Sequence, residues 1–205
     1  MVYKYSFFCI YTGGRDQRTD LRQTGYTTEL NLFYEGFYNE VNNLQEVDLI
    51  NVQLRNSVSP YAIEYQNTDL LQSNGSAPVK FVNISSGNYY IAVTHRNSLE
   101  TWSAVSLSFT SGTTEAYNFS TASSQAFGGN LIQVDAAPVR FAAFSGDVDQ
   151  DGTIDIADGS LIDNDAFNFT TGYLPTDING DSITDVADAV FADNNGYNFV
   201  GKITP

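Results

Sequence analysis

The sequence contains a single cysteine, Cys9, and a single histidine, His95, among its 205 residues. A lone cysteine excludes a disulfide within the chain, so no such bridge links two sheets. A catalytic histidine needs a nucleophile or a metal partner, and the stretch THRNSLETW (94–102) offers only Arg96 and Glu100 nearby. We therefore expect His95 to be a hydrogen-bonded structural residue. We expect no enzymatic activity. The sequence leaves one alternative open, a pair of carboxylates that cleaves glycosides.

Basic residues are scarce as well, with nine lysines and arginines against 24 acidic residues. They form no basic stripe, which argues against nucleic-acid binding. The acidic residues are unevenly placed, because residues 146–205 hold twelve aspartates, no glutamate, no arginine and one lysine, or −11 of the net charge of −15. A short segment with that charge tends to stay expanded unless counter-ions bind it.

The first acidic run, GDVDQDGTIDIAD (146–158), has the spacing of a twelve-residue calcium loop. Aspartates occupy loop positions 1, 3, 5, 9 and 12, and Gly152 occupies position 6, where the chain must turn sharply. Carboxylate and carbonyl oxygens at alternate positions are the ligands that calcium prefers. The predicted ligands are Asp147, Asp149, Asp151, the Thr153 carbonyl and Asp158.

The pattern recurs thirty residues later in DINGDSITDVAD (177–188), and the flanking DNDAFNF (163–169) recurs as DNNGYNF (193–199). A repeat in register favours calcium loops over the alternative, which is a pair of solvated acidic turns whose aspartates cap helices. Position 6 of this second loop is Ser182, which predicts a shifted turn or a weaker site. Asp155 and Asp185, at position 9, are predicted to act through water or from outside the ligand shell. The predicted ligands of the second ion are Asp177, Asn179, Asp181, the Ile183 carbonyl and Asp188.

Each loop is followed by a short helical pattern, at residues 157–167 and 187–195. The predicted packing face consists of Leu161, Ile162, Ala189, Val190 and Phe191. Because so small a segment cannot build a full core, we expect two Ca²⁺ ions to act as folding cofactors.

Residues 26–144 consist of short runs rich in tyrosine, phenylalanine, valine, isoleucine and threonine, separated by turn residues. This pattern predicts an antiparallel β-sandwich of the immunoglobulin or fibronectin type. Tyr89, Ile91 and Val93 alternate onto one face, and Trp102 is expected in the core. The eight predicted strands cover residues 28–38, 47–57, 60–66, 78–85, 88–96, 102–111, 115–121 and 138–144.

Residues 146–199 resemble a dockerin module, in which two calcium loops closed by aspartate are each followed by a helix. The resemblance implies docking onto a cohesin domain, with loop positions 10 and 11 reading the partner; these are Ile156, Ala157, Val186 and Ala187. Residues 28–205 as a whole resemble a C-terminal region of secreted bacterial proteins, a β-sandwich followed by a dockerin-like pair. The implied fold is mainly β, with an N-terminal arm and linker (1–25), a sandwich (26–144) and a small α-helical double EF-hand-loop module (145–205).

The N-terminal stretch MVYKYSFFCIYT (1–12) reads as a strand with an unbroken apolar face, and residues 13–25 read as a polar linker. The stretch is too short to span a membrane and lacks a signal-peptide cleavage site. Residues 1–12 are either the first strand of their own sandwich or an arm that completes the sheet of a neighbouring subunit.

These observations predict a non-catalytic, calcium-stabilised protein that assembles with other subunits, as a homo-oligomer, polymer or filament. Loose calcium sites fill where calcium is millimolar, which predicts an extracellular or cell-surface location. The alternative is a carbohydrate-binding or cohesin-docking accessory module of a secreted bacterial enzyme, in which exposed tyrosines stack on glycans. Four tripeptides permit N-glycosylation, at Asn74, Asn83, Asn118 and Asn168.

Overall fold

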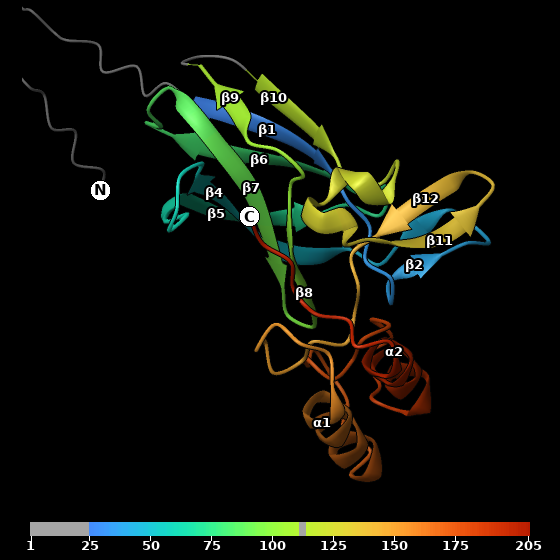
Figure 1. The fold of residues 1–205 in the computed structure, drawn as a ribbon. Coiled ribbons are helices and arrows are strands. Elements are labelled where there is room, and N and C mark those ends of the chain that lie inside the picture. The colour runs from blue at the N-terminus through green and yellow to red at the C-terminus, as the bar shows by residue number, and fades with distance from the viewer. Residues whose placement is uncertain (1–24, 111–113) are drawn as a thin grey trace, which may run out of the picture.

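The computed structural model describes residues 25–110 and 114–205. Over these residues the protein is mainly β, with two helices that lie together at one end of the sheets (Figure 1). The predicted arm, residues 1–12, and nearly all of the predicted linker lie outside the described residues.

Two sheets form the body of the molecule (Figure 1). The smaller sheet has the strand order β10-β1-β6, and the larger has the order β5-β4-β7-β8, with β9 also paired to β7. The pairs β2–β3 and β11–β12 form separate two-stranded sheets. The strands are β1 (Gly25–Asn31), β2 (Tyr38–Asn39), β3 (Leu44–Gln45), β4 (Asp48–Asn56), β5 (Ile63–Leu71), β6 (Ser76–Val82), β7 (Gly87–His95), β8 (Ser98–Trp102), β9 (Leu107–Phe109), β10 (Thr114–Asn118), β11 (Ile132–Ala136) and β12 (Val139–Ala142).

The two larger sheets share one hydrophobic core, so the body is a β-sandwich. Alternate residues of β1, β4, β6 and β7 point into it, as period-2 side-chain geometry requires. The predicted inward face of Tyr89, Ile91 and Val93 is confirmed, since all three side chains are buried. Trp102 is buried as predicted, and the guanidinium carbon of Arg55 lies 4.9 Å from its ring.

The prediction of a fully antiparallel sandwich is wrong at one pair, because β1 runs parallel to β10. The predicted strand 28–38 ends at Asn31, after which the chain turns and forms the β2–β3 pair. Strands β8 and β11 were missed, since their sequences, SLETW and IQVDA, show no alternation strong enough to distinguish them from loops.

The two predicted helices are confirmed as α1 (Ile156–Phe167) and α2 (Val186–Tyr197). Each is capped by the aspartate just before it, Asp155 or Asp185, whose side chain accepts the N–H two residues on. The aspartate three residues later accepts the N–H of this capping residue, which completes a capping box. These reciprocal bonds satisfy backbone donors that a helix N-terminus otherwise leaves unpaired.

The predicted packing face of the helices is wrong at Leu161 and Val190, which are exposed. Ile162 is buried as predicted, and Ala189 and Phe191 pack partly against the same cluster. The cluster is completed by buried residues from the loops, the sandwich and the second helix: Leu99, Val148, Ile154, Ile178 and Ala192. Because loop and sandwich residues supply four of the six buried side chains of this small core, only a narrow stripe of each helix is needed to cover it.

The helices and loops are held directly against the sandwich. Asn195 of α2 donates one hydrogen bond to Glu35, at 2.6 Å, and another to the Ser145 carbonyl, at 2.8 Å. Asn97 donates to the Asp177 carbonyl at 2.8 Å, and its own carbonyl accepts the N–H of Gly146 at 2.7 Å. Buried contacts of this kind fix the orientation of the helices and loops relative to the sandwich.

Gly36 lies at the closest approach between the two parts, where a Cβ atom would stand 2.4 Å from the Ile178 carbonyl oxygen. We expect Gly36→Ala to lower the free energy of unfolding by about 1–3 kcal/mol, because the backbones must separate to admit the methyl group. Chemical denaturation measures the change. The matched control is Gly159→Ala in α1, where a Cβ meets no atom within 4 Å and should stabilise the helix by up to about 1 kcal/mol. Equal effects of the two substitutions would contradict the prediction.

Candidate metal centre

Three carboxylates of the first loop converge. Oxygen atoms of Asp147, Asp149 and Asp151 all lie within 4.8 Å of one another. Asp147 is buried, whereas Asp149 and Asp151 are exposed. The structure therefore brings loop positions 1, 3 and 5 to one point, as the spacing predicted.

Backbone N–H groups orient these carboxylates. The N–H of Asp151 donates to Asp149 Oδ1 at 3.1 Å, and the N–H of Thr153 donates to Asp151 Oδ1 at 2.8 Å. The second oxygen of each carboxylate accepts none of these bonds and is open to another partner. Gly152, at position 6, has a φ of 92°, which an L side chain rarely adopts.

Asp158, at position 12, is buried and closes the loop. Its Oδ1 accepts the N–H groups of Val148 at 2.8 Å and Asp149 at 3.2 Å, and its Oδ2 accepts the N–H of Asp155 at 2.9 Å. One carboxylate thus joins the beginning of the loop to the first turn of α1. Since each carboxylate oxygen has two lone pairs, Oδ2 can still accept a further partner.

The first loop concentrates negative charge that its own donors do not balance. Burial, together with repulsion from Asp158, Asp149 and Asp151, raises the pKa of Asp147 to about 7, against a lowering by the Gly152 N–H. Burial also raises the pKa of Asp158. Carboxylates this close are stabilised when a cation lies between them.

The second loop repeats this geometry. Asp188 accepts the N–H groups of Ile178 at 2.7 Å, Asn179 at 3.0 Å and Asp185 at 2.9 Å, as Asp158 does in the first loop. Ser182 adopts a φ of 67° in place of the expected glycine, so the turn itself is not shifted. The difference lies in charge, because Asn179 supplies an amide where the first loop has an aspartate.

A sandwich residue that the sequence did not single out reaches the second loop. Arg96 Nη2 lies 3.5 Å from Asp177 Oδ2, and Arg96 Nε donates to Asp48 Oδ2 at 2.9 Å. The guanidinium carbon lies 4.5 Å from the ring centre of Tyr173 and 5.4 Å from that of Phe37. Burial raises the pKa of Asp177, and the positive charge of Arg96 lowers it. No spacing in the sequence could show this contact, because the residues are 81 positions apart.

His95 is a buried, hydrogen-bonded residue, as predicted. Its Nε2 lies 3.1 Å from Asp48 Oδ2, its Nδ1 lies 3.2 Å from Ser98 Oγ, and its ring stacks on Tyr34 at 4.2 Å between centres. Burial lowers the pKa of His95, and the hydrogen bond and charge of Asp48 oppose that shift. The ring therefore stays neutral near pH 7 and supports the end of β7 next to the loops.

The side chains at loop positions 10 and 11 face solvent. Ile156 and Ala157 in the first loop are exposed, and so are Val186 and Ala187 in the second. Exposed apolar side chains at both related positions are available for contact with another molecule.

The donor set is made only of carboxylate, amide and carbonyl oxygens, the ligand type of a hard divalent cation. No sulfur atom or imidazole nitrogen contributes to it. The convergence of Asp147, Asp149 and Asp151 fits such an ion. The arrangement can hold a cation and thereby bind each loop to the helix that follows.

No protein-family model matches the sequence, and no curated protein matches it. Two solved structures are similar at low identity. One is a C-terminal interface mutant of the type II cohesin–X–dockerin complex from Acetivibrio cellulolyticus, 16% identical, with 88% of this chain and 97% of that chain covered and a TM-score of 0.46. The other is an N-terminal interface mutant of the same type of complex, 14% identical, covering 84% and 94% of the two chains with a TM-score of 0.42. At these TM-scores the likeness carries no argument about function.

Neither helix that the structure describes has the length and apolar character needed to cross a membrane.

Proposed function

We propose that this protein is a non-catalytic, calcium-stabilised assembly module that works outside the cell. The observation that carries the proposal is the convergence of the Asp147, Asp149 and Asp151 carboxylates around one point. Asp158 and the Thr153 carbonyl complete the first ligand set. The second ion takes Asp177, Asn179, Asp181, the Ile183 carbonyl and Asp188.

The ligand type supports calcium over transition metals, because all the donors are oxygens. Several carboxylates on one loop suit the six to eight ligands of calcium better than the strict octahedron of magnesium. The second site binds its ion more weakly, since Asn179 removes one negative charge and Arg96 places a positive charge beside Asp177. Two sites of modest affinity fill at extracellular calcium concentrations.

In this proposal the ions act on folding and not on signalling. The loops supply three of the six buried residues in the small core beneath α1 and α2, so a bound ion stabilises both the loop and the packing below it. The sandwich (26–144) is held together by its own hydrophobic core, whereas the dockerin-like module (145–205) depends on bound ions as well. This difference is the basis for dividing the chain into these two parts.

Isothermal titration calorimetry of the chelator-treated protein with CaCl₂ tests the proposal. We expect two ions per chain, with the second binding more weakly than the first. Fewer than one ion per chain, with helix content unchanged by chelator, would overturn the proposal.

A second candidate function is docking onto a cohesin domain. The exposure of Ile156, Ala157, Val186 and Ala187 favours it, because these residues match the partner-reading positions implied by the dockerin resemblance. Pull-down with purified cohesin domains tests it, using Ile156→Asp as the variant that should lose binding. No comparable observation favours glycan binding, since the sandwich tyrosines whose burial is described are all buried or half-buried.

The proposed assembly uses the N-terminal arm, and donation of residues 1–12 as a strand to another subunit stays a prediction. Deleting residues 1–14 should leave a folded protein that no longer assembles, because main-chain pairing along the arm is lost. Analytical ultracentrifugation measures the mass, and near-ultraviolet circular dichroism confirms folding. If the deletion unfolds a protein that was monomeric beforehand, residues 1–12 are a strand of their own sandwich.

A further inference from the structure

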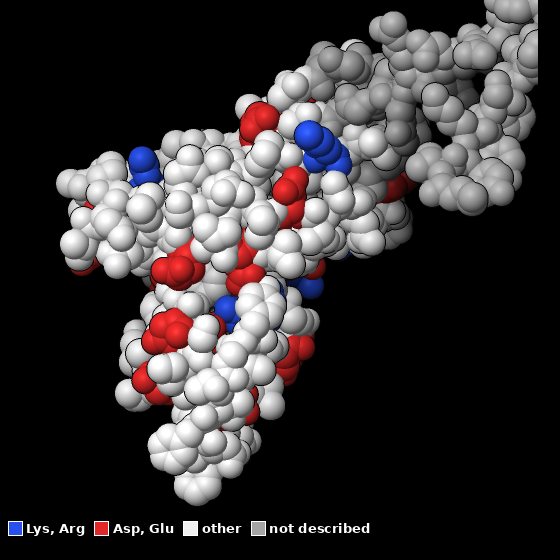
Figure 2. Space-filling model, turned by 180° about the vertical axis from the view of Figure 1, so that it is seen from behind, with Lys and Arg blue, Asp and Glu red and all other residues white. Residues whose placement is uncertain are grey.

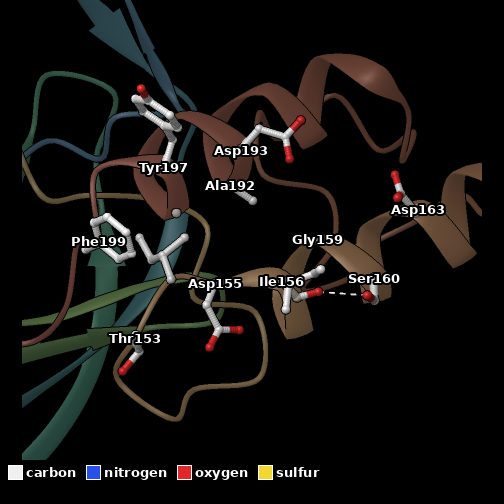
Figure 3. Close-up of a pocket in the computed structure, with 12 residues that line it drawn as sticks. Thr153, Asp155, Ile156, Gly159, Ser160, Asp163, Ala192, Asp193, Tyr197 and Phe199 are labelled. Carbon is white, nitrogen blue, oxygen red and sulfur yellow. Dashed lines mark hydrogen bonds between the residues drawn. The ribbon is translucent and has the colours of Figure 1, made fainter.

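A groove of about 750 Å³ lies between the N-terminal half of α1 and the C-terminal half of α2 (Figure 3). Its most accessible apolar side chains are Ile156, which is 85% exposed, Tyr197, 85% exposed, and Phe199, 91% exposed. Aromatic side chains this exposed are costly in water, and contiguous ones mark interaction sites. The groove therefore suits an apolar segment of another chain.

The groove is also acidic. Asp163 of α1 and Asp193 of α2 line it, both are exposed, and neither is a predicted calcium ligand. None of the described residues that line it is basic. Figure 2 shows acidic side chains spread over the helical end of the molecule. The partner that fits must combine apolar and positively charged side chains.

One segment of this chain has that composition. Residues 1–24 hold four of the nine basic residues, Lys4, Arg15, Arg18 and Arg22, against two aspartates. Their net charge is +2, whereas the other 181 residues together carry −17. The same segment contains five aromatic residues within its first eleven positions. We propose that residues 1–24 of one copy dock into the α1–α2 groove of a neighbouring copy. This proposal rests on the assembly function proposed above.

The segment joins the sandwich at the end opposite the groove. β1 begins at Gly25, which pairs with Val82 at the end of the sandwich away from the helices (Figure 1). β7 runs from that end, at Gly87, to His95 beside the helical module, a rise of about 26 Å at ~3.3 Å per residue. In the proposed contact the segment of one copy and the groove of the next therefore meet head to tail, an arrangement that builds an open filament when the rotation does not close.

Charge reversal tests the contact. Size-exclusion chromatography with light scattering measures the mass of the full chain in calcium over a range of protein concentrations. Wild type should form oligomers, and both Arg15→Glu/Arg18→Glu/Arg22→Glu and Asp163→Lys/Asp193→Lys should weaken association at least tenfold. Combining all five changes should restore most of it, because the complementary charges are exchanged. A wild type that is monomeric throughout, or a combined variant that fails to recover, overturns the proposal.

The apolar part of the contact has a matched control. Tyr197→Ala/Phe199→Ala should weaken association, whereas Phe167→Ala/Phe169→Ala should not. The second pair occupies the equivalent positions at the end of α1, is 83% and 86% exposed, and lies outside the groove. Equal losses from both pairs overturn the proposal.

Two further results separate this inference from the proposals on which it rests. Calcium stoichiometry is measured on every variant, so a failure of the calcium sites is seen independently of assembly. Deleting residues 1–14 could abolish association while the groove variants leave it unchanged. That result would assign the arm to a sheet edge and overturn the groove as its acceptor.

Discussion

Asp147→Ala should abolish calcium binding at both loops, because it unfolds the two helices that carry Asp158 and Asp188, while the sandwich stays folded. Asp147 is the buried member of the three converging carboxylates, so its loss removes a ligand and leaves the remaining charges uncompensated. An ion present at a hundredfold excess over its dissociation constant contributes about 2.7 kcal/mol to folding, and this contribution is lost with the site.

Two spectroscopic probes follow the two parts separately. Circular dichroism at 222 nm reports mainly on α1 and α2, and the fluorescence of Trp102, the single tryptophan, reports on the sandwich. In calcium the variant should lose helix signal while Trp102 stays shielded from quenchers. The control is Asp163→Ala, which removes an exposed aspartate outside both loops and should bind two ions. Simultaneous loss of both signals would show that the sandwich does not fold without the module.

Asp48→Asn should lower the free energy of unfolding by about 3–5 kcal/mol, the cost of removing one partner from a buried charge pair. Asp48 lies beneath the joint between sandwich and module, and its carboxylate accepts the N–H of Leu49 at 2.7 Å and three hydrogen bonds from other side chains. The donors are His95 at 3.1 Å, Arg96 at 2.9 Å and Tyr173 at 2.5 Å. Urea denaturation measures the loss, with Glu29→Gln as a control; the Glu29 side chain on β1 is exposed, so this change should alter stability by less than about 0.5 kcal/mol.

The effect of Asp48→Asn should depend on pH in one direction. Burial raises the pKa of Asp48, but the hydrogen bonds from His95, Tyr173 and Arg96 outweigh it and hold the pKa well below the ordinary value of 3.8. A depressed pKa contributes stability that is full above pH 3.8 and declines as the pH falls below it. The difference between wild type and variant should therefore be constant from pH 6 to 8 and shrink in acid. A difference that grows in acid would contradict this assignment.

Local patterns in the sequence predicted the features that depend on neighbouring residues. The period of two in NYYIAVTHR placed Tyr89, Ile91 and Val93 on the buried face, because side chains alternate along any strand. The two acidic loops and the helices that follow were predicted from fixed positions within twelve residues. Asp147, Asp149 and Asp151 converge because a short loop with a glycine at position 6 leaves their side chains few other directions.

Contacts between distant residues were decided only by the tertiary structure. The parallel pairing of β1 with β10 joins segments more than eighty positions apart, and no local periodicity distinguishes it from an antiparallel pair. Arg96 lies beside Asp177 because β7 ends where the second loop packs, a coincidence of two folded surfaces. Leu161 and Val190 remain exposed because loop and sandwich residues supply four of the six buried side chains of the small core. The sequence by itself determined which residues could bind a cation; the packing of the module against the sandwich determined which charges surround it.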